Sequence, residues 1–289
     1  NKFLQITTEK YFIGQYAGKN ITTGDYNSVF GFFSGVSLNS GSRNTFLGNH
    51  AGEKTTIGYS NIFLGNAAGN SNQDGFNNIF IGDSAGFMSK GLNNIIIGTG
   101  AGKKCPWSGH VVFIGNGAGA NDMSGWPNTF IGNNAGYNNT SGGQNTFIGN
   151  FCGYKNTIGT SNVFIGNNAA FSNIDGQQNV IIGENASYNG TNGGGNVFIG
   201  FNSAYSNQTS HGNTFVGNYT GYQITTGNGN TFLGNGSGSA TSIGEENVFI
   251  GYGSGGVNIE GSWNTYVGRA SGLAIINGYS NTFLGYGSG

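Results

Sequence analysis

The sequence predicts an all-β protein whose residues 1–289 form a single repeat array, a parallel β-solenoid (β-roll) of about seventeen 17-residue coils. Three observations lead to this prediction. A glycine recurs at a nearly constant interval, the positions around it keep a fixed chemical character, and no segment shows the 3.6-residue spacing of an amphipathic helix. Composition agrees: glycine accounts for 58 residues and charged residues for 7%, while 13% aromatic residues argue against disorder.

The anchor of the repeat is the glycine that ends the motif Asn-Thr-Phe-Leu-Gly or a close variant of it. Every step between successive anchors is 17 residues, except for a step of 16 from Gly82 to Gly98. This length is too short for a helical-hairpin repeat, which needs roughly 33 residues. It fits one solenoid coil made of a short strand, a tight glycine turn, a second strand or arc, and a looser turn. The anchors are Gly14, Gly31, Gly48, Gly65, Gly82, Gly98, Gly115, Gly132, Gly149, Gly166, Gly183, Gly200, Gly217, Gly234, Gly251, Gly268 and Gly285.

Each position relative to the anchor has its own chemistry, and stacking of coils about 4.8 Å apart would turn each position into a ladder. The fourth position before the anchor is Asn in all copies except Lys10 and Val111, and the second before it is Phe in thirteen copies. The third position after the anchor is always small. We therefore expect an amide-bonded Asn ladder and a stacked Phe core opposite small residues. Representative members are Asn44, Asn61, Asn78, Asn128 and Asn145, and Phe46, Phe63, Phe80, Phe130, Phe147 and Phe164.

The position directly before the anchor is also apolar, with Ile, Leu or Val in every copy but Phe30. Neighbouring strand residues point to opposite faces, so a regular strand cannot bury both this ladder and the Phe ladder. Either a sharp turn or bulge tucks both inward, or one of them faces outward as an oligomeric interface along the array. The sequence does not decide which ladder faces outward.

The strand motif Asn196-Val-Phe-Ile-Gly200 resembles the Ser-Val-Ala-Ile-Gly strand in the head repeats of trimeric autotransporter adhesins. The chain is more similar still to the Asn-Thr-Phe-Leu-Gly-Asn-x-Ala-Gly repeats of bacterial surface and tail-fibre-type proteins that end in an intramolecular chaperone domain. The resemblance covers the whole chain, although the coil is longer than the autotransporter coil and no segment matches the family's membrane anchor, stalk or chaperone. It implies a left-handed β-roll, a homotrimer and attachment to surfaces or matrix.

These features favour a structural or adhesive element, an extracellular or cell-surface fibre or adhesin rod whose lateral faces bind surfaces or partner chains. The expected assembly is a homo-oligomer, and the expected ligand is a carbohydrate or another surface. Aromatic residues that follow the Ala-Gly pair in consecutive coils are candidate binding residues, because their rings have flat amphipathic faces. Covering of the solenoid edge is the alternative role. These residues are Tyr137, Tyr154, Phe171, Tyr188, Tyr205 and Tyr222.

Two alternative functions stay open. We expect an array uncapped at both ends, either a fragment of a longer chain or a subunit that stacks end to end into a filament. Residues 1–155 carry nine basic and six acidic side chains and residues 156–289 carry one and five, which suits such stacking. The other alternative is an ice-binding β-roll, because Thr45, Thr129 and Thr146 share one strand position and the motif has a weaker similarity to Asn-x-Val-x-Gly ice-binding repeats.

No catalytic, metal or cofactor site is predicted, and the protein is not expected to be an enzyme. His50, His110 and His211 occupy different repeat positions, and the acidic residues are scattered. A net charge of −1 gives no basic footprint for nucleic acid, and no apolar run reaches the roughly 20 residues of a membrane helix. Cys152 is expected as a buried substitute for Ala and Cys105 in an outer loop, without a disulfide between them.

Overall fold

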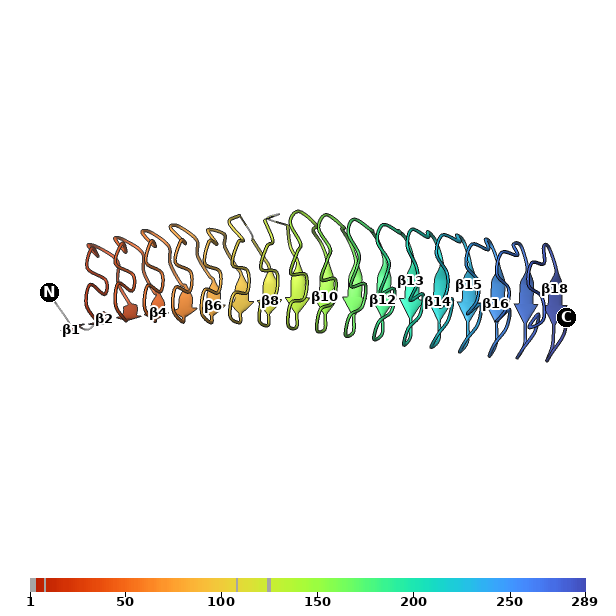
Figure 1. Cartoon of the computed structure of the whole chain (residues 1–289). Helices are drawn as coiled ribbons and strands as arrows, with labels where there is room; N and C mark the ends of the chain where they lie inside the picture. Colours follow the sequence, from red (N-terminus) through yellow and green to blue (C-terminus); the bar gives the residue numbers. More distant parts are fainter. Residues whose placement is uncertain (1–3, 8, 108, 124–125) are drawn as a thin grey trace. The chain divides into compact units, whose positions relative to one another are not determined.

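The computed structural model describes residues 4–7, 9–107, 109–123 and 126–289. In these residues the secondary structure is entirely β with no helix, as predicted. The chain comprises two compact units, Asn1–Gln144 (unit 1) and Asn145–Gly289 (unit 2). Within each unit consecutive strands lie side by side in chain order, one strand for each coil (Figure 1). The predicted parallel β-solenoid is therefore confirmed for both units, while its handedness stays a prediction.

Unit 1 begins with β1 (Leu4–Ile6), which pairs antiparallel with β2 (Lys10–Ile13) and lies outside the repeat pattern. From β2 onward each strand pairs in parallel with the next. The register aligns each residue with the residue at the same repeat position in the next coil. The 16-residue step leaves the register intact, because Phe80 is aligned with Ile96. The other strands are β3 (Asn27–Phe30), β4 (Thr45–Leu47), β5 (Ile62–Leu64), β6 (Ile79–Ile81), β7 (Ile95–Ile97), β8 (Val112–Ile114) and β9 (Thr129–Ile131).

Unit 2 consists of parallel strands in the same register, so that Val163 is aligned with Val180 and Phe164 with Ile181. Where the structure describes them, the remaining residues of each coil form turns and bends, so the predicted second strand or arc is an arc of turns and not a strand. These turns still bond from coil to coil, as in the backbone bond from Ser187 N to Ser203 O (2.9 Å). The strands are β10 (Thr146–Ile148), β11 (Val163–Ile165), β12 (Val180–Ile182), β13 (Val197–Ile199), β14 (Thr214–Val216), β15 (Thr231–Leu233), β16 (Val248–Ile250), β17 (Thr265–Val267) and β18 (Thr282–Leu284).

The Phe ladder forms the core of both units. The rings of Phe46 and Phe63 in unit 1 lie 4.8 Å apart and 3° from parallel, and those of Phe147 and Phe164 in unit 2 lie 4.6 Å apart. These four rings are fully buried, whereas the strand residues on either side of them are half-buried or exposed. The strand therefore alternates regularly, and the interpretation that a bulge tucks both ladders inward is wrong. The Ile/Leu ladder faces outward.

The turn that follows each strand packs tightly on the core ring. Ala68 is fully buried, and a Cβ placed on Gly69 would lie only 2.7 Å from Cε2 of Phe63. A larger residue at the Gly69 position therefore requires a smaller core residue or a shifted ring. Ser187 occupies this position in a coil where Ile181 replaces the ring. Ala170 and Ala204 occupy the same position in coils that keep Phe164 and Phe198, so a methyl group there is accommodated beside a ring. The buried Ala68 agrees with the predicted placement of a small residue against the Phe core.

The predicted Asn ladder is also confirmed. Asn179 Nδ2 donates to Asn162 Oδ1 (3.2 Å) and to Gly193 O (2.8 Å), and Asn179 Oδ1 accepts the backbone N–H of Asn196 (3.0 Å). Each amide thus satisfies groups in its own coil and in both adjacent coils, away from water. The representative members are buried: Asn44, Asn61, Asn78 and Asn128 in unit 1, and Asn145 in unit 2.

Val111 breaks the ladder in unit 1. The backbone N–H of Val111 still donates to Asn94 Oδ1 (3.1 Å), but a valine side chain has no oxygen for the next coil. The Nδ2 of Asn128 instead donates to the buried carboxylate of Asp122 (3.0 Å) and to Gly142 O (2.9 Å). In the coil that contains Val111, the carboxylate of Asp122 therefore provides the acceptor that an Asn side chain provides in the other coils.

The seventh position after the anchor also points inward, which the sequence analysis did not identify. Cys105 occupies it and is only 1% exposed, so the prediction that Cys105 lies in an outer loop is wrong. This position mixes apolar, hydroxyl and amide side chains, so it has no hydrophobic signature in the sequence. Its other buried members in unit 1 are Leu38, Thr55, Asn72, Ser89, Asp122 and Asn139.

Both cysteines are buried thiols that form no disulfide. Burial raises the pKa of the Cys152 thiol well above its ordinary value, opposed by a backbone hydrogen bond from Ile148, and Sγ donates to Phe164 O at 3.2 Å. Because the thiolate is the reactive form, we expect neither cysteine to react with iodoacetamide in the folded protein at neutral pH. Mass spectrometry after labelling should show modification only in denaturant. Rapid labelling of Cys105 in the folded state would contradict its buried position.

Candidate functional site

The outward side of the strands in unit 2 is an uncharged surface, which we call the sheet face. The residues before and after the core position contribute two parallel rows along β10–β18. One row mixes Thr with Val, and the other contains only Ile, Leu and Val, mostly half-buried. The members are Thr146, Ile148, Val163, Ile165, Val180, Ile182, Val197, Ile199, Thr214, Val216, Thr231, Leu233, Val248, Ile250, Thr265, Val267, Thr282 and Leu284.

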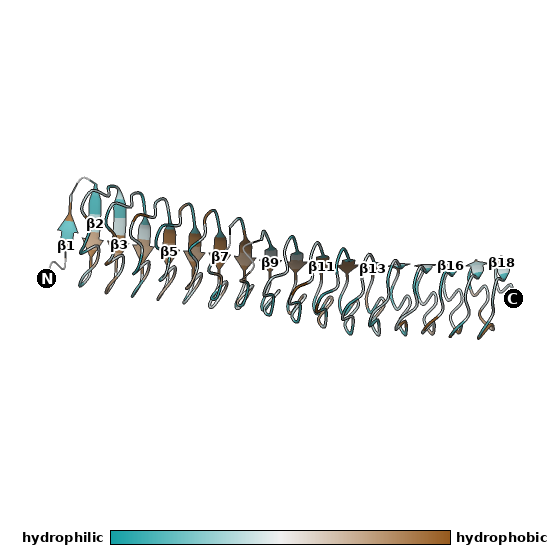
Figure 2. Cartoon of the chain, turned by 90° about the horizontal axis from the view of Figure 1, so that it is seen from above, coloured by the Kyte–Doolittle hydropathy of each residue, from teal (hydrophilic) through white to brown (hydrophobic). Residues whose placement is uncertain are grey.

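Unit 1 has a sheet face of the same kind over β4–β9, where Figure 2 shows β5 and β7 in hydrophobic colours. Several side chains there are well exposed: Leu47 is 52% and Ile62 is 39% accessible. No residue of β4–β9 or β10–β18 is charged. The structure thus places the Ile/Leu ladder and the Thr row on the same outward surface. A continuous apolar surface of this kind is characteristic of an interaction site.

The aromatic residues singled out in the sequence form a ladder in unit 2. The ring centroids of Phe171 and Tyr188 lie 5.0 Å apart at 6°, those of Tyr188 and Tyr205 5.4 Å apart at 6°, and those of Tyr205 and Tyr222 5.3 Å apart at 14°. Tyr154 stacks on Phe171 at 5.3 Å in the same way. Because the ring faces cover one another, the ladder exposes mainly edges and hydroxyl groups rather than the flat platforms that favour sugar stacking.

Tyr137 belongs to unit 1 and is half-buried there. The role of the six aromatic residues in surface binding stays a prediction. The geometry favours their alternative role as a cover for the solenoid edge, with part of each ring removed from water. Polar residues such as Asn189 and Ser206 directly follow these rings in the chain.

Histidine, cysteine and acidic side chains are the candidates for a metal or catalytic centre. Among the described residues, no cluster of three or more His, Cys, Asp or Glu side chains is placed to hold a metal ion. His50 Nδ1 lies 2.9 Å from Glu53 Oε2, and His211 Nδ1 accepts the backbone N–H of Gly194 (3.0 Å). In the part of the chain that the structure describes, no helix is long and apolar enough to span a membrane.

The fold and its surfaces define the chain as a parallel β-solenoid with uncharged sheet faces. No family model, curated protein or solved structure matches the chain. The geometry of these surfaces is therefore the basis on which a function can be assigned.

Proposed function

We propose that this protein is a structural and adhesive element of an extracellular or cell-surface fibre, in which the sheet face packs against further copies of the same chain. The observation that supports the proposal is the sheet face itself, an aliphatic row beside a Thr/Val row, both half-buried or exposed along β10–β18. Burial of apolar surface contributes about 25 cal/mol per Å², so a face of this length provides a strong drive to associate. The β-branched side chains also lose little rotamer freedom on burial.

A second copy of the chain is the partner that best suits this surface. Side chains on the sheet face repeat once per coil, about every 4.8 Å. Another copy presents rows with the same spacing, so that its side chains can interdigitate along the whole contact instead of at a single point. A homotrimer, as the sequence resemblance implies, would enclose three such faces around a common apolar core.

Sedimentation equilibrium should give a mass that is a small multiple of 29.9 kDa for the wild-type chain. Replacing Val197 and Ile199 with Glu would bury unpaired carboxylates in the interface, each costing several kcal/mol, so the variant should sediment as the monomer. Circular dichroism should show that the strands remain. The matched control is a double Glu substitution of Gln223 and Thr226, which are exposed away from the strands.

A wild-type chain that is monomeric at tens of micromolar would contradict the proposal, as would a Val197 and Ile199 double variant with an unchanged mass. A broad distribution of very long polymers, insensitive to the double variant, would favour end-to-end filament assembly instead.

Ice binding is the second candidate, because the Thr row and an aliphatic row share the flat sheet face. Such a surface can order water in a regular array. Thermal hysteresis of the wild-type protein tests this directly. A measurable hysteresis that disappears in the Val197 and Ile199 double variant would support ice binding, whereas none in a monomeric protein would exclude it.

A further inference from the structure

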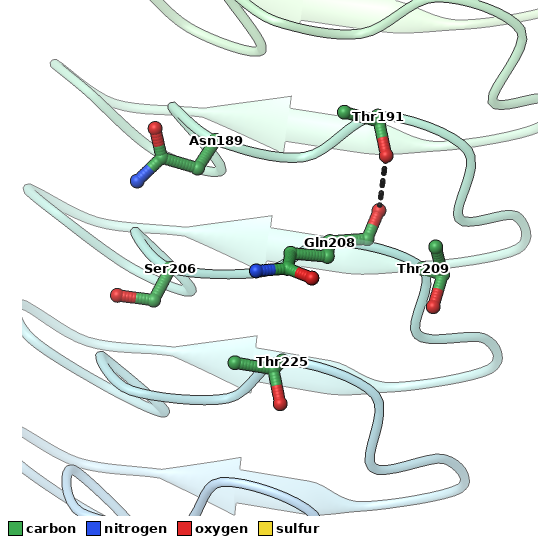
Figure 3. Close-up of a pocket in the computed structure, with 6 residues that line it drawn as sticks. All are labelled: Asn189, Thr191, Ser206, Gln208, Thr209 and Thr225. Atoms are coloured by element: carbon green, nitrogen blue, oxygen red, sulfur yellow. Dashed lines mark hydrogen bonds between the residues drawn. The ribbon is translucent and has the colours of Figure 1, made fainter.

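A shallow groove of about 450 Å³ lies on the turn side of unit 2 and is lined by Asn189, Thr191, Ser206, Gln208, Thr209 and Thr225 (Figure 3). These residues come from three consecutive coils. Most occupy the sixth and eighth positions after the anchor, which point outward on either side of the buried seventh position held by Asn207. The Gln208 side chain lies between Thr191 of the preceding coil and Thr225 of the following one (Figure 3).

The groove is lined by amide and hydroxyl side chains that can form further hydrogen bonds. Thr191 Oγ1 donates to Gln208 O (3.1 Å), which leaves the lone pairs of this hydroxyl available as acceptors. Thr225 Oγ1 donates to Ser242 O (3.1 Å) and lies 3.4 Å from Ser242 Oγ, which uses part of its acceptor capacity. The side chains of Asn189, Ser206, Gln208 and Thr209 have no protein hydrogen bond within the described residues. Both donors and acceptors therefore line the groove, whose floor the coil-to-coil backbone bonds hold in place.

The lining contains no charged residue, which separates this groove from the equivalent positions of unit 1. There Glu53 directly precedes the row, and Lys54 and Lys90 lie within it, at the sixth and eighth positions after their anchors. A ligand for the unit 2 groove should thus be uncharged, rich in groups that both donate and accept, and extended. Three coils span roughly 10 Å, so the ligand should itself repeat along the solenoid axis.

We infer that this groove binds a neutral polysaccharide strand lying along the coil axis. Sugar hydroxyls both donate and accept hydrogen bonds, as the lining side chains require, and the strand needs no counter-charge. The Tyr188 and Tyr205 positions directly precede Asn189 and Ser206, so that half-exposed ring edges border the same row. The inference rests on the adhesive role proposed above and assigns it a ligand class and a place distinct from the sheet face.

The test is affinity electrophoresis of the intact chain in gels that contain hydroxyethyl cellulose, dextran or galactomannan. At least one of these neutral polymers should retard the wild-type chain. A neutral hydrogen bond to a ligand changes affinity by about fivefold, so a variant with both Gln208→Ala and Thr209→Val should bind at least about tenfold more weakly. Gln73→Ala, at the position in unit 1 equivalent to Gln208, should bind like the wild type.

The inference is overturned if none of the three polymers retards the wild-type chain, or if the Gln208 and Thr209 double variant is retarded as strongly as the wild type. It is also overturned if only dextran sulfate retards the chain and added salt abolishes the effect. Sedimentation of the same double variant separates the two proposals. An unchanged mass with weaker polymer binding places the sugar site in the groove, independently of self-association.

Discussion

Substitution of Gly183 by alanine is expected to destabilise unit 2 by about 3–5 kcal/mol, enough to unfold part of it at room temperature. The backbone of Gly183 has φ +140°, which side chains rarely adopt, and an added Cβ would lie 2.3 Å from the carbonyl oxygen of Gly200 in the next coil. The methyl group can be accommodated only by separating the two coils. This separation would weaken the strand pairing on both sides.

Guanidinium denaturation followed by circular dichroism measures this loss as a lower midpoint. Gly212→Ala is the matched control, since Gly212 has a left-handed φ of +65° but no neighbouring atom within 4 Å of an added Cβ. Only the backbone strain of about 1–2 kcal/mol should then appear. Equal midpoints for the two variants would show that coil spacing does not explain the glycine at the anchor.

Replacing Asn179 with alanine is the second large effect and is expected to lower the free energy of unfolding of unit 2 by about 2–6 kcal/mol. The substitution removes the donor for Gly193 O and the acceptor for the backbone N–H of Asn196, both in the buried interior. A buried group left without a partner costs about 1–3 kcal/mol, and two are left here. The loss should spread to adjacent coils, because repeats are stabilised mainly by their neighbours.

Thermal and chemical denaturation should both show that Asn179→Ala lowers the free energy of unfolding. Asn167→Ala should change this free energy by less than about 0.5 kcal/mol. Asn167 is exposed and accepts a surface bond from Asn150 Nδ2 (3.0 Å), so water replaces its partner. If the two variants were equally stable, the buried ladder would contribute no more than a surface amide.

The coil, the Phe core and the Asn ladder could be predicted because nearly every copy of the repeat has the same type of residue at the same position. The left-handed backbone two residues after each anchor was not predicted. It occurs even at Phe33, Phe151 and Tyr219, with φ between 51° and 56°. The enrichment of Asn and Gly at that position was the available signal.

The sequence alone therefore determined that equivalent side chains of successive coils stack on one another within each unit, because a 17-residue repeat with a fixed chemical character at each position is compatible with few other folds. Only the tertiary structure decided which apolar row faces outward, that Cys105 is internal, and where a polar groove opens. The reason is that a 17-residue coil made mostly of turns has no simple inside–outside period. The direction of each side chain depends on how the turn backbone bonds to the coils before and after it.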